Sequence, residues 1–351
     1  MVAPHIGNTS NVQRKGHEHV GRIVVISTGG TIASRWQGSG YVAEASGHDV
    51  LACAAVPEGV VTEVVDLFNV NSSRLTTAHQ LTLLRAVHNA LADPGVDGIV
   101  VTHGTDTLEE SAFLLDLHHD DPRPVVFTGA QRPLEAVDGD AAGNLHDALL
   151  TAATVRDLGV LVAFDGQVHA ARGTVKVCAL APRAFADPSG AHVGDVGFGS
   201  VSVHRKPDRS APLPLPEAEV AVPRVDIIMH HCDADPLLLR AAVGAGAQGI
   251  VLVGTGAGNT TPDIAAAVDE AVASGVLVAL TTRVPEGPVA EIYSGGGGAV
   301  DLAAAGAVLT GTLRAGQARM AVLAALLAAD TPAARVKTLR HVLCLPSPIP
   351  S

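Results

Sequence analysis

Short apolar runs alternate with longer segments of helical spacing along most of the chain. Eight runs rich in Val, Ile and Leu have the length and composition of buried strands, and they lie at residues 22–27, 60–67, 98–103, 124–128, 159–164, 225–229, 249–254 and 276–281. Apolar residues recur at helical spacing in the segments 77–91, 107–117, 140–158, 263–274 and 315–329. Strands that alternate with helices predict an α/β fold with a mostly parallel sheet flanked by helices.

One segment interrupts this alternation and divides the chain. Residues 204–223 contain five prolines, which lack a backbone donor and disfavour both helices and central strands. With 351 residues, the chain is long enough for two ordinary domains of about 100–200 residues each. We therefore expect a loose N-terminal arm at 1–20, a larger N-terminal α/β domain at 21–203, a proline-rich linker at 204–223 and a smaller C-terminal α/β domain at 224–351.

Composition narrows the class of protein. Apolar residues make up 47% of the chain but aromatic residues only 3%, so the core must be built from Val, Ala, Leu and Ile, which suits buried parallel strands. The formal net charge of −12 argues against nucleic acid and anionic membranes as partners, because both are bound through Lys and Arg. Four widely separated cysteines, and a polar N-terminus without an apolar signal segment, favour a cytoplasmic protein.

The stretch STGGTIAS at residues 27–34 follows the first predicted strand, where it could bind a phosphate or present a hydroxyl group. A P-loop requires a lysine after its glycines, and this stretch has none. A formal GxGxxG match, GAGAQG at residues 244–249, follows a predicted helix and precedes a strand, which is the reverse of the dinucleotide-binding order. We interpret it as the end of a helix, so a nucleotide-binding role has little support.

Two histidine-rich stretches have the composition of metal sites. They are HHDD at residues 118–121 and HHCD at residues 230–233. Neighbouring residues on a strand point to opposite faces, so adjacent histidines seldom share one ion. We interpret both stretches as polar residues at loop entries and expect no metal.

Small hydroxyl residues and glycines gather where four predicted strands end. The first strand leads into STGGT, the second toward NVNSSRLTT, the third into THGTDT and the fourth into TGAQRP. In open α/β sheets, ligands bind outside the carboxyl ends of the strands. Hydroxyl groups and backbone amides at this edge suit a small, polar, charged ligand.

A threonine in such a site becomes a nucleophile when another group accepts its proton. Asp106 is a candidate carboxylate, and Lys176 is a candidate partner because apolar residues flank it in GTVKVCAL. Each feature also has a purely structural explanation. The glycines can form a tight turn, Asp106 can cap a helix, and Lys176 can lie on an edge strand.

These motifs closely resemble the signature blocks of the bacterial-type L-asparaginase and glutaminase-asparaginase family. The two dense blocks are STGGTIAS and VTHGTDTLEES, and the resemblance continues through FTGAQRP, DAAGNLHDAL, RGTVK, GTGAGN and TTRVPEG. It covers residues 21–329. The resemblance implies a larger N-terminal and a smaller C-terminal α/β domain, and a homotetramer built from intimate dimers. It also implies an amidohydrolase that acts on L-asparagine through an acyl-enzyme, without a metal or cofactor.

The resemblance also implies roles for individual residues. Thr31 matches the family nucleophile, and Tyr41 matches a tyrosine beside it in a mobile segment at residues 35–47. The second catalytic group corresponds to Thr105, Asp106 and Lys176. Residues that match substrate-binding or pocket-lining positions are Gly30, Ser72, Ser73, Gly104, Ala130 and Asn259. Whether Thr31 or Thr105 attacks first stays open, and we favour Thr31 because it lies beside the mobile segment.

The sequence departs from the family pattern after Ser72, where Ser73 and Arg74 replace the usual glutamine and aspartate. Side-chain selectivity is therefore open, and glutaminase-asparaginase activity is an alternative. In some members a glutamate of the neighbouring subunit completes the site, and Glu291 or Tyr293 lies in the corresponding region. A tRNA-dependent amidotransferase subunit and a non-catalytic amino-acid-binding module are further alternatives. The net charge of −12 disfavours the former, and the full set of catalytic residue types disfavours the latter.

Overall fold

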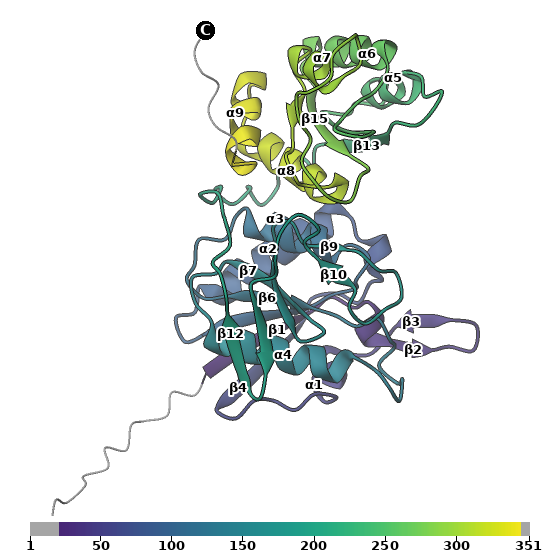
Figure 1. Cartoon of the computed structure of the whole chain (residues 1–351). Coiled ribbons are helices and arrows are strands. Elements are labelled where there is room, and N and C mark those ends of the chain that lie inside the picture. Colours follow the sequence, from purple (N-terminus) through teal and green to yellow (C-terminus); the bar gives the residue numbers. More distant parts are fainter. Residues whose placement is uncertain (1–20, 345–351) are drawn as a thin grey trace, which may run out of the picture.

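The computed structural model describes residues 21–344, so the predicted N-terminal arm and the last residues of the predicted C-terminal domain lie outside the described residues. Two α/β domains stack on each other, as expected from the sequence (Figure 1). The larger one contains an eight-stranded sheet with the order β12-β11-β8-β7-β6-β5-β1-β4. The smaller one contains a four-stranded sheet with the order β13-β14-β15-β16.

Parallel strands form one side of the large sheet, and antiparallel strands form the other. The parallel strands are β1 (Gly21–Ser27), β4 (Val60–Asp66), β5 (Gly98–Thr102), β6 (Val125–Thr128) and β7 (Val160–Phe164). The antiparallel strands are β8 (Gln167–Ala170), β11 (Gly194–Gly197) and β12 (Ser200–Val203). The apolar pattern predicted the five parallel strands but missed the three antiparallel ones. Strand β8 is buried but has only four residues, two of which are Gln167 and His169, whereas β11 and β12 are short and partly exposed.

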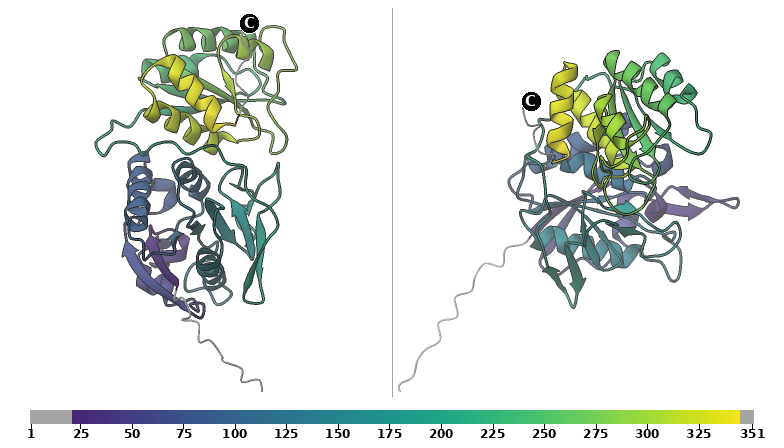
Figure 2. Two further views of the ribbon diagram at one scale, coloured as in Figure 1. Left: turned by 90° about the vertical axis from the view of Figure 1, so that its left-hand side faces the viewer. Right: turned by 45° about the horizontal axis from the view of Figure 1, so that its top comes forward.

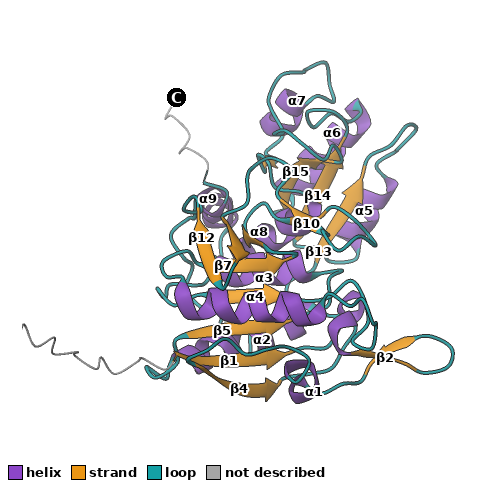
Figure 3. Cartoon of the chain, turned by 60° about the horizontal axis from the view of Figure 1, so that its bottom comes forward, coloured by secondary structure: helices purple, strands orange, loops and turns teal. Residues whose placement is uncertain are grey.

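Helices cover both faces of the large sheet, as predicted. Val24 and Ile26 of β1 pack into one core with α2 (Thr77–Leu91) and α3 (Leu108–Asp116). The alternate residues of β1 pack into a second core with α1 (Gly47–Leu51) and α4 (Ala141–Thr154) on the opposite face. Figure 3 shows α4 lying over one face of the sheet, roughly along the direction of its strands. Because both faces are buried, each central strand is apolar throughout.

Helix α4 is shorter than the predicted segment 140–158. It ends at Thr154 because Val155 adopts an extended conformation, with ψ 154°. Asp157 and Gly159 then take positive φ values of 61° and 74°, which turn the chain into β7. Gly159 takes such a φ value without the steric cost that a side chain would carry.

The smaller domain repeats the same layered design. Its strands are β13 (Val225–Met229), β14 (Gly249–Gly254), β15 (Leu277–Thr282) and β16 (Val308–Leu309). One face packs against α5 (Leu237–Gly244), α6 (Pro262–Ala273) and α7 (Ala299–Ala304), and the other packs against α8 (Ala315–Ala328) and α9 (Pro332–Val342). As expected, the GAGAQG stretch joins the end of α5 to the start of β14.

Helix α8 joins the two domains (Figure 2). Gln317 of this helix is fully buried, and its side-chain amide donates to the carbonyl groups of Ala171 and Thr174, each at 2.8 Å. Its side-chain oxygen accepts the N–H of Gly173 at 2.8 Å. Helix α8 therefore holds the turn that leads into β9 (Val175–Lys176), which pairs with β10 (Phe185–Ala186).

The proline-rich segment at 204–223 contains no helix or strand. It lies against the larger domain, where Arg209 pairs with Asp116 at 2.8 Å and the N–H of Leu213 donates to the carbonyl of Leu117 at 2.8 Å. Within residues 21–344, no helix combines the length and apolar character needed to cross a membrane.

Candidate active site

The four strand ends that carry the hydroxyl residues are neighbours in the sheet. Their order is β6-β5-β1-β4, so the loops that follow them meet at one edge. The chain after β1 turns through Gly29 and Gly30, which have φ values of 96° and 87°. A Cβ at Gly30 would lie 2.2 Å from the Cα of Gly104. The glycines therefore let the loops after β1 and β5 pack backbone against backbone.

Ser72 connects the loop after β4 to the loop after β5. It lies in a short 3-10 helix (Ser72–Arg74) and is only 2% exposed. Its hydroxyl accepts the N–H of Asp106 at 3.2 Å, and its carbonyl accepts the hydroxyl of Thr107 at 3.0 Å. A Cβ at Gly104 would lie 2.5 Å from the Ser72 hydroxyl oxygen. The structure therefore brings together Gly30, Gly104, Ser72 and Asp106.

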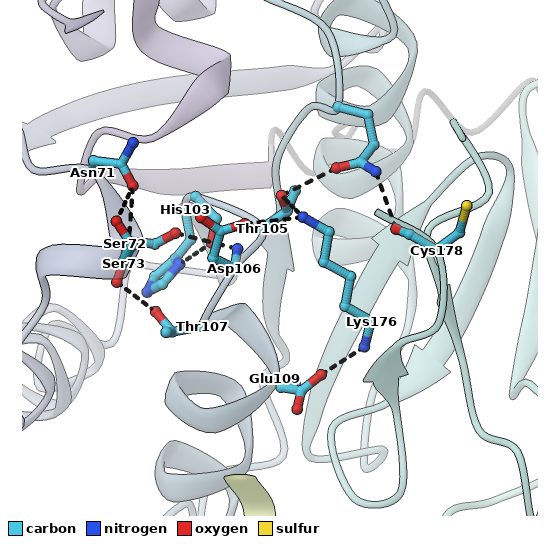
Figure 4. Close-up of polar contacts among 12 residues, drawn as sticks. Asn71, Ser72, Ser73, His103, Thr105, Asp106, Thr107, Glu109, Lys176 and Cys178 are labelled. Carbon is cyan, nitrogen blue, oxygen red and sulfur yellow. Dashed lines mark hydrogen bonds and ion pairs between the residues drawn. The ribbon is translucent and has the colours of Figure 1, made fainter. Parts of the chain in front are cut away.

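Lys176 reaches the same edge from the turn held by α8 (Figure 4). Its Nζ donates to the hydroxyl of Thr105 at 2.8 Å and to Oδ1 of Asp106 at 3.0 Å. The Lys176 side chain is 18% exposed, and that of Asp106 is 53% exposed. The pairing predicted from sequence is therefore present, and its carboxylate faces the solvent side of the site.

Two residues that the sequence analysis did not single out support this group. Gln131, within the FTGAQRP motif, accepts the Thr105 hydroxyl at 3.1 Å and donates to the carbonyl of Cys178 at 3.3 Å. Glu109 accepts the backbone N–H of Lys176 at 2.5 Å. Burial raises the pKa of the Glu109 carboxyl to about 7, although this hydrogen bond favours its charged form. Position within the quoted motifs was the available signal for both residues.

His103 connects the loop after β5 to helix α3. It is fully buried, its Nδ1 lies 2.7 Å from the carbonyl of Gly104, and its Nε2 lies 3.0 Å from the hydroxyl of Ser111. Burial lowers the pKa of His103 to about 4, so the ring is neutral at pH 7. Its role is therefore to position the loop.

Thr31 begins a short 3-10 helix (Thr31–Ala33) directly after the glycine turn. Ile32 and Ala33 are fully buried, and the Ser34 hydroxyl donates to the carbonyl of Gly30 at 2.9 Å, which fixes the backbone. Thr31 itself is half-buried. Among the described residues, its hydroxyl forms no hydrogen bond, so it is available to a ligand.

Tyr41 is not brought against Thr31. It begins β3 (Tyr41–Ala43), at the far end of the hairpin that starts with β2 (Ser34–Trp36), and the hairpin projects from the domain (Figure 1). Its side chain is 54% exposed and packs on Trp36 with ring centroids 5.1 Å apart.

The remaining predicted site residues differ in solvent exposure and in the domain to which they belong. Ala130 is fully buried after β6. Ser73 is exposed, and its hydroxyl donates to Oδ1 of Asn71 at 3.0 Å. Asn259 belongs to the smaller domain, in the turn after β14, and its buried Oδ1 has no hydrogen-bond partner within residues 21–344. This chain alone therefore does not join Asn259 to the Lys176 group.

The histidine pair lies where a loop follows α3, as expected, but both side chains are buried. His118 and His119 are 3% and 0% exposed, because this turn is covered by the proline-rich segment and neighbouring loops. His118 Nδ1 lies 2.9 Å from the carbonyl of Pro214, and His119 Nε2 lies 2.9 Å from the carbonyl of Arg123. One nitrogen of each ring is therefore bound to a backbone carbonyl, which fixes how both rings lie in this turn.

The arrangement combines the parts that acyl transfer requires. It has a free hydroxyl on Thr31, a second hydroxyl on Thr105 polarised by an ammonium group, and the Asp106 carboxylate. Closely packed backbone loops surround them, and backbone N–H groups can stabilise an oxyanion. None of these groups requires a metal ion for such chemistry.

Two family models match the chain. The model described as "Asparaginase, N-terminal" matches residues 22–209, and the model described as "Glutaminase/Asparaginase C-terminal domain" matches residues 224–339. The two matched regions contain the large and the small sheet, respectively.

Individual proteins are similar over nearly the whole chain. An L-asparaginase of Bacillus licheniformis is 37% identical over 88% of this chain and 95% of its own length. A probable periplasmic L-asparaginase of Haemophilus influenzae is 33% identical over 87% of this chain and 88% of its own. The crystal structure of a probable cytoplasmic L-asparaginase from Campylobacter jejuni matches with a TM-score of 0.84 and 27% identity, over 92% of this chain and 99% of that one.

Proposed function

Because this chain belongs to the asparaginase family, we propose that it hydrolyses L-asparagine to L-aspartate and ammonia. The observation that carries the proposal is the contact of Lys176 Nζ with both Thr105 and Asp106, at the strand edge where Thr31 presents a free hydroxyl. An amino-acid-binding module has no need for this combination of groups.

The substrate is a zwitterion, and the site offers a partner for each of its charges. The Asp106 carboxylate accepts the substrate α-ammonium group. The Ser72 hydroxyl and the backbone N–H of Asp106, which are already joined at 3.2 Å, bind the α-carboxylate. Gly30, Gly104 and Ala130 line the space for the side-chain amide, and Ser73 lies at its rim. The proposed position of the substrate thus follows from the charges and hydrogen-bonding groups that these loops present.

The reaction proceeds in two steps. The Thr31 oxygen bonds to the amide carbon, and the resulting oxyanion is stabilised by backbone N–H groups. The Thr31 proton passes to the amide nitrogen, the C–N bond breaks, and ammonia leaves an ester between Thr31 and the substrate. A water molecule near Thr105, whose hydroxyl is polarised by Lys176, then adds to the ester carbon. This step releases L-aspartate and restores the Thr31 hydroxyl.

We propose that the β2–β3 hairpin, which carries Tyr41, is mobile and closes over the site. In the open arrangement, the exposed Tyr41 and Trp36 lie at the far end of the β2–β3 hairpin. Gly38, at the tip, has φ 82°, and a Cβ added there would meet no neighbouring segment within 4 Å, so the tip is free to move. Folding the hairpin over the site would bring Tyr41 toward Thr31 and exclude water from the acyl-enzyme.

We propose that the protein is a cytoplasmic homotetramer of intimate dimers. The buried Oδ1 of Asn259 lacks a partner within the described chain, which supports a contribution from a second subunit. Exposed apolar side chains on β13 and α5 also support association, and they belong to Ile227, Met229, Leu237 and Leu238. The four cysteines are all free thiols, which favours a reducing compartment.

Ammonia release from L-asparagine and L-glutamine tests the function. We expect release from L-asparagine by the native chain, a loss of at least about a thousandfold in Thr31→Ala, and native rates in Thr82→Ala. Thr82 is a matched control because it is an exposed threonine on α2 whose hydroxyl binds only the Ala78 carbonyl. No release from either amide would overturn the enzyme assignment. Equal rates with both amides would identify a glutaminase-asparaginase.

A further inference from the structure

A second cluster of reactive side chains lies far from the candidate active site. Oδ1 of Asp195 is 3.0 Å from Nε2 of His192, and Oδ2 of Asp195 is 2.7 Å from Nε2 of His204. One donor atom from each of the three residues lies within 4.8 Å of the others. Across residues 21–344, no other set of three such residues is this close. The members of this cluster are spread over residues 192–204 and match no familiar motif, so the sequence alone does not reveal it.

The β-sheet register brings these residues together. In the hairpin formed by β11 and β12, Asp195 pairs with Ser202, so Asp195 and His204 share one face of the sheet. Strand β8 pairs on the other side, with Gln167 opposite Asp195, which places His169 on the same face. His192 approaches from the loop just before β11, and its ring lies 5.9 Å from that of His204. Backbone pairing therefore preorganises the cluster.

One nitrogen atom of this cluster, and one of the neighbouring His169, are buried without a hydrogen-bond partner among the described residues. His192 Nε2 lies close to Asp195, but the contact is not aligned as a hydrogen bond. His169 is 3% exposed, its Nδ1 has no partner, and its ring centroid is 6.0 Å from that of His192. Buried polar nitrogens without partners are rare, and the binding of an ion nearby is one recognised explanation.

We propose that His192, Asp195 and His204 form a binding site for a divalent transition-metal ion of the zinc type. Two imidazoles and one carboxylate are donors that zinc prefers, whereas calcium and magnesium favour sites made of oxygen atoms alone. Three protein ligands leave the fourth tetrahedral position to water. Small side-chain rotations suffice, because the three donor atoms already lie within 4.8 Å of one another.

Neighbouring cations are held by other groups and do not compete for Asp195. The guanidinium of Arg205 donates to the carbonyl of Ala191 at 2.9 Å, and that of Arg183 pairs with Asp165 at 3.3 Å.

The cluster of His192, Asp195 and His204 is also far from the residues of the proposed amide hydrolysis. Strand β11 is four positions from β5 in the sheet, which corresponds to roughly 19 Å. A bound ion would therefore fasten the loop before β11 to the hairpin and take no part in amide hydrolysis.

Zinc titration of the full-length chain, prepared without an added histidine tag and freed of metal by chelation, tests this proposal. Calorimetry should show one zinc ion per chain with a dissociation constant of about 10 μM or lower. His204→Gln and Asp195→Asn should each weaken binding at least tenfold. His48→Gln should bind like the native chain, because His48 is an exposed histidine outside the cluster. Zinc should also raise the melting temperature of the native chain more than that of His204→Gln.

Cobalt(II) provides an independent readout of the donor atoms. Its visible absorption should change in His192→Gln and stay unchanged in His48→Gln. Equal zinc affinity and stoichiometry in native, His204→Gln and Asp195→Asn chains would overturn the proposal, as would the absence of zinc binding by the native chain. Circular dichroism of each variant separates loss of the site from loss of the fold. Asparagine hydrolysis is measured separately, so failure of the proposed function would leave these results interpretable.

Discussion

The ammonium group of Lys176 lies 2.8 Å from the hydroxyl of Thr105, although the two residues are 71 positions apart in the sequence. The contact links the turn held by helix α8 to the loop after β5. The same ammonium group pairs with Asp106 at 3.0 Å. A single lysine thus connects a hydroxyl and a carboxylate that belong to adjacent residues.

Lys176→Met should lower kcat by about 10²–10⁴-fold, because it removes the group that polarises Thr105. The melting temperature should change little, since methionine retains the length and apolar contacts of the lysine stem. Lys206→Met is the matched control, because Lys206 is exposed in the proline-rich segment, and it should retain native kinetics. Steady-state ammonia release checks both variants. A native kcat in Lys176→Met would remove this lysine from the mechanism.

Ser72→Ala should raise KM by about 10-fold or more, because a hydrogen bond to a charged group contributes about 1.5–3 kcal/mol. It also leaves the N–H of Asp106 without its partner at 3.2 Å. Ser73→Ala should have a smaller effect, since the Ser73 hydroxyl is exposed and already bonded to Asn71. Comparing KM for the two variants ranks the two serines, and a larger effect at Ser73 would reverse their proposed roles.

Gly30→Ala should destabilise the fold by more than about 3 kcal/mol, because the new Cβ would meet the Gly104 backbone at 2.2 Å and φ is 87°. Gly38→Ala is the matched control. Gly38 has a similar φ of 82°, but no atom lies within 4 Å of its Cβ position, so only a conformational cost of about 1–2 kcal/mol is expected. Urea unfolding of both variants measures the difference. Similar values would show that the contact with Gly104 relaxes freely.

Glu109→Gln should change how stability depends on pH. Burial raises the folded-state pKa of Glu109 to about 7, so between about pH 4.5 and 7 the folded state retains a proton that the unfolded state has lost. The Glu109 contribution to stability therefore falls as pH rises through this window. Burial lowers the folded-state pKa of His103 to about 4, so the His103 contribution to stability falls on acidification. This contribution is the same in the native chain and in Glu109→Gln, so it cancels in their difference.

The difference between Glu109→Gln and the native chain isolates the glutamate. Glutamine can still accept the N–H of Lys176, so the variant should gain on the order of 1–2 kcal/mol relative to the native chain between pH 5 and 7.5. Unfolding measured at several pH values checks this expectation. A stability difference that does not vary with pH would place the Glu109 titration outside this range.

Gln317→Leu should destabilise the protein by about 3 kcal/mol or more, because it leaves the buried polar groups of Ala171, Gly173 and Thr174 without partners. It should also lower kcat more than it raises KM, since the affected turn carries Lys176. Gln248→Leu, an exposed glutamine before β14, is the control and should resemble the native chain. Unchanged kinetics in folded Gln317→Leu would show that Lys176 is positioned without α8.

Much of the fold could be predicted from local patterns. The central strands are apolar throughout because helices cover both sheet faces, so their runs stand out in the sequence. Strands β8, β11 and β12 have only four residues each, β8 includes polar residues although it is buried, and β11 and β12 are partly exposed, so their apolar pattern is weak. The end of α4 was placed too late because the extended Val155 and the positive φ at Asp157 depend on the path into β7.

The sequence by itself determined the two α/β domains and the strand ends that carry the reactive residues. Strand periodicity and motif order are local properties, so they can be read without coordinates. Only the tertiary structure decided that Gln131 and Glu109 support Lys176, that Tyr41 lies exposed on a hairpin, and that His192, Asp195 and His204 converge. These relationships depend on sheet order, register and packing between distant segments, and no local pattern encodes the distance between side chains that only folding brings together.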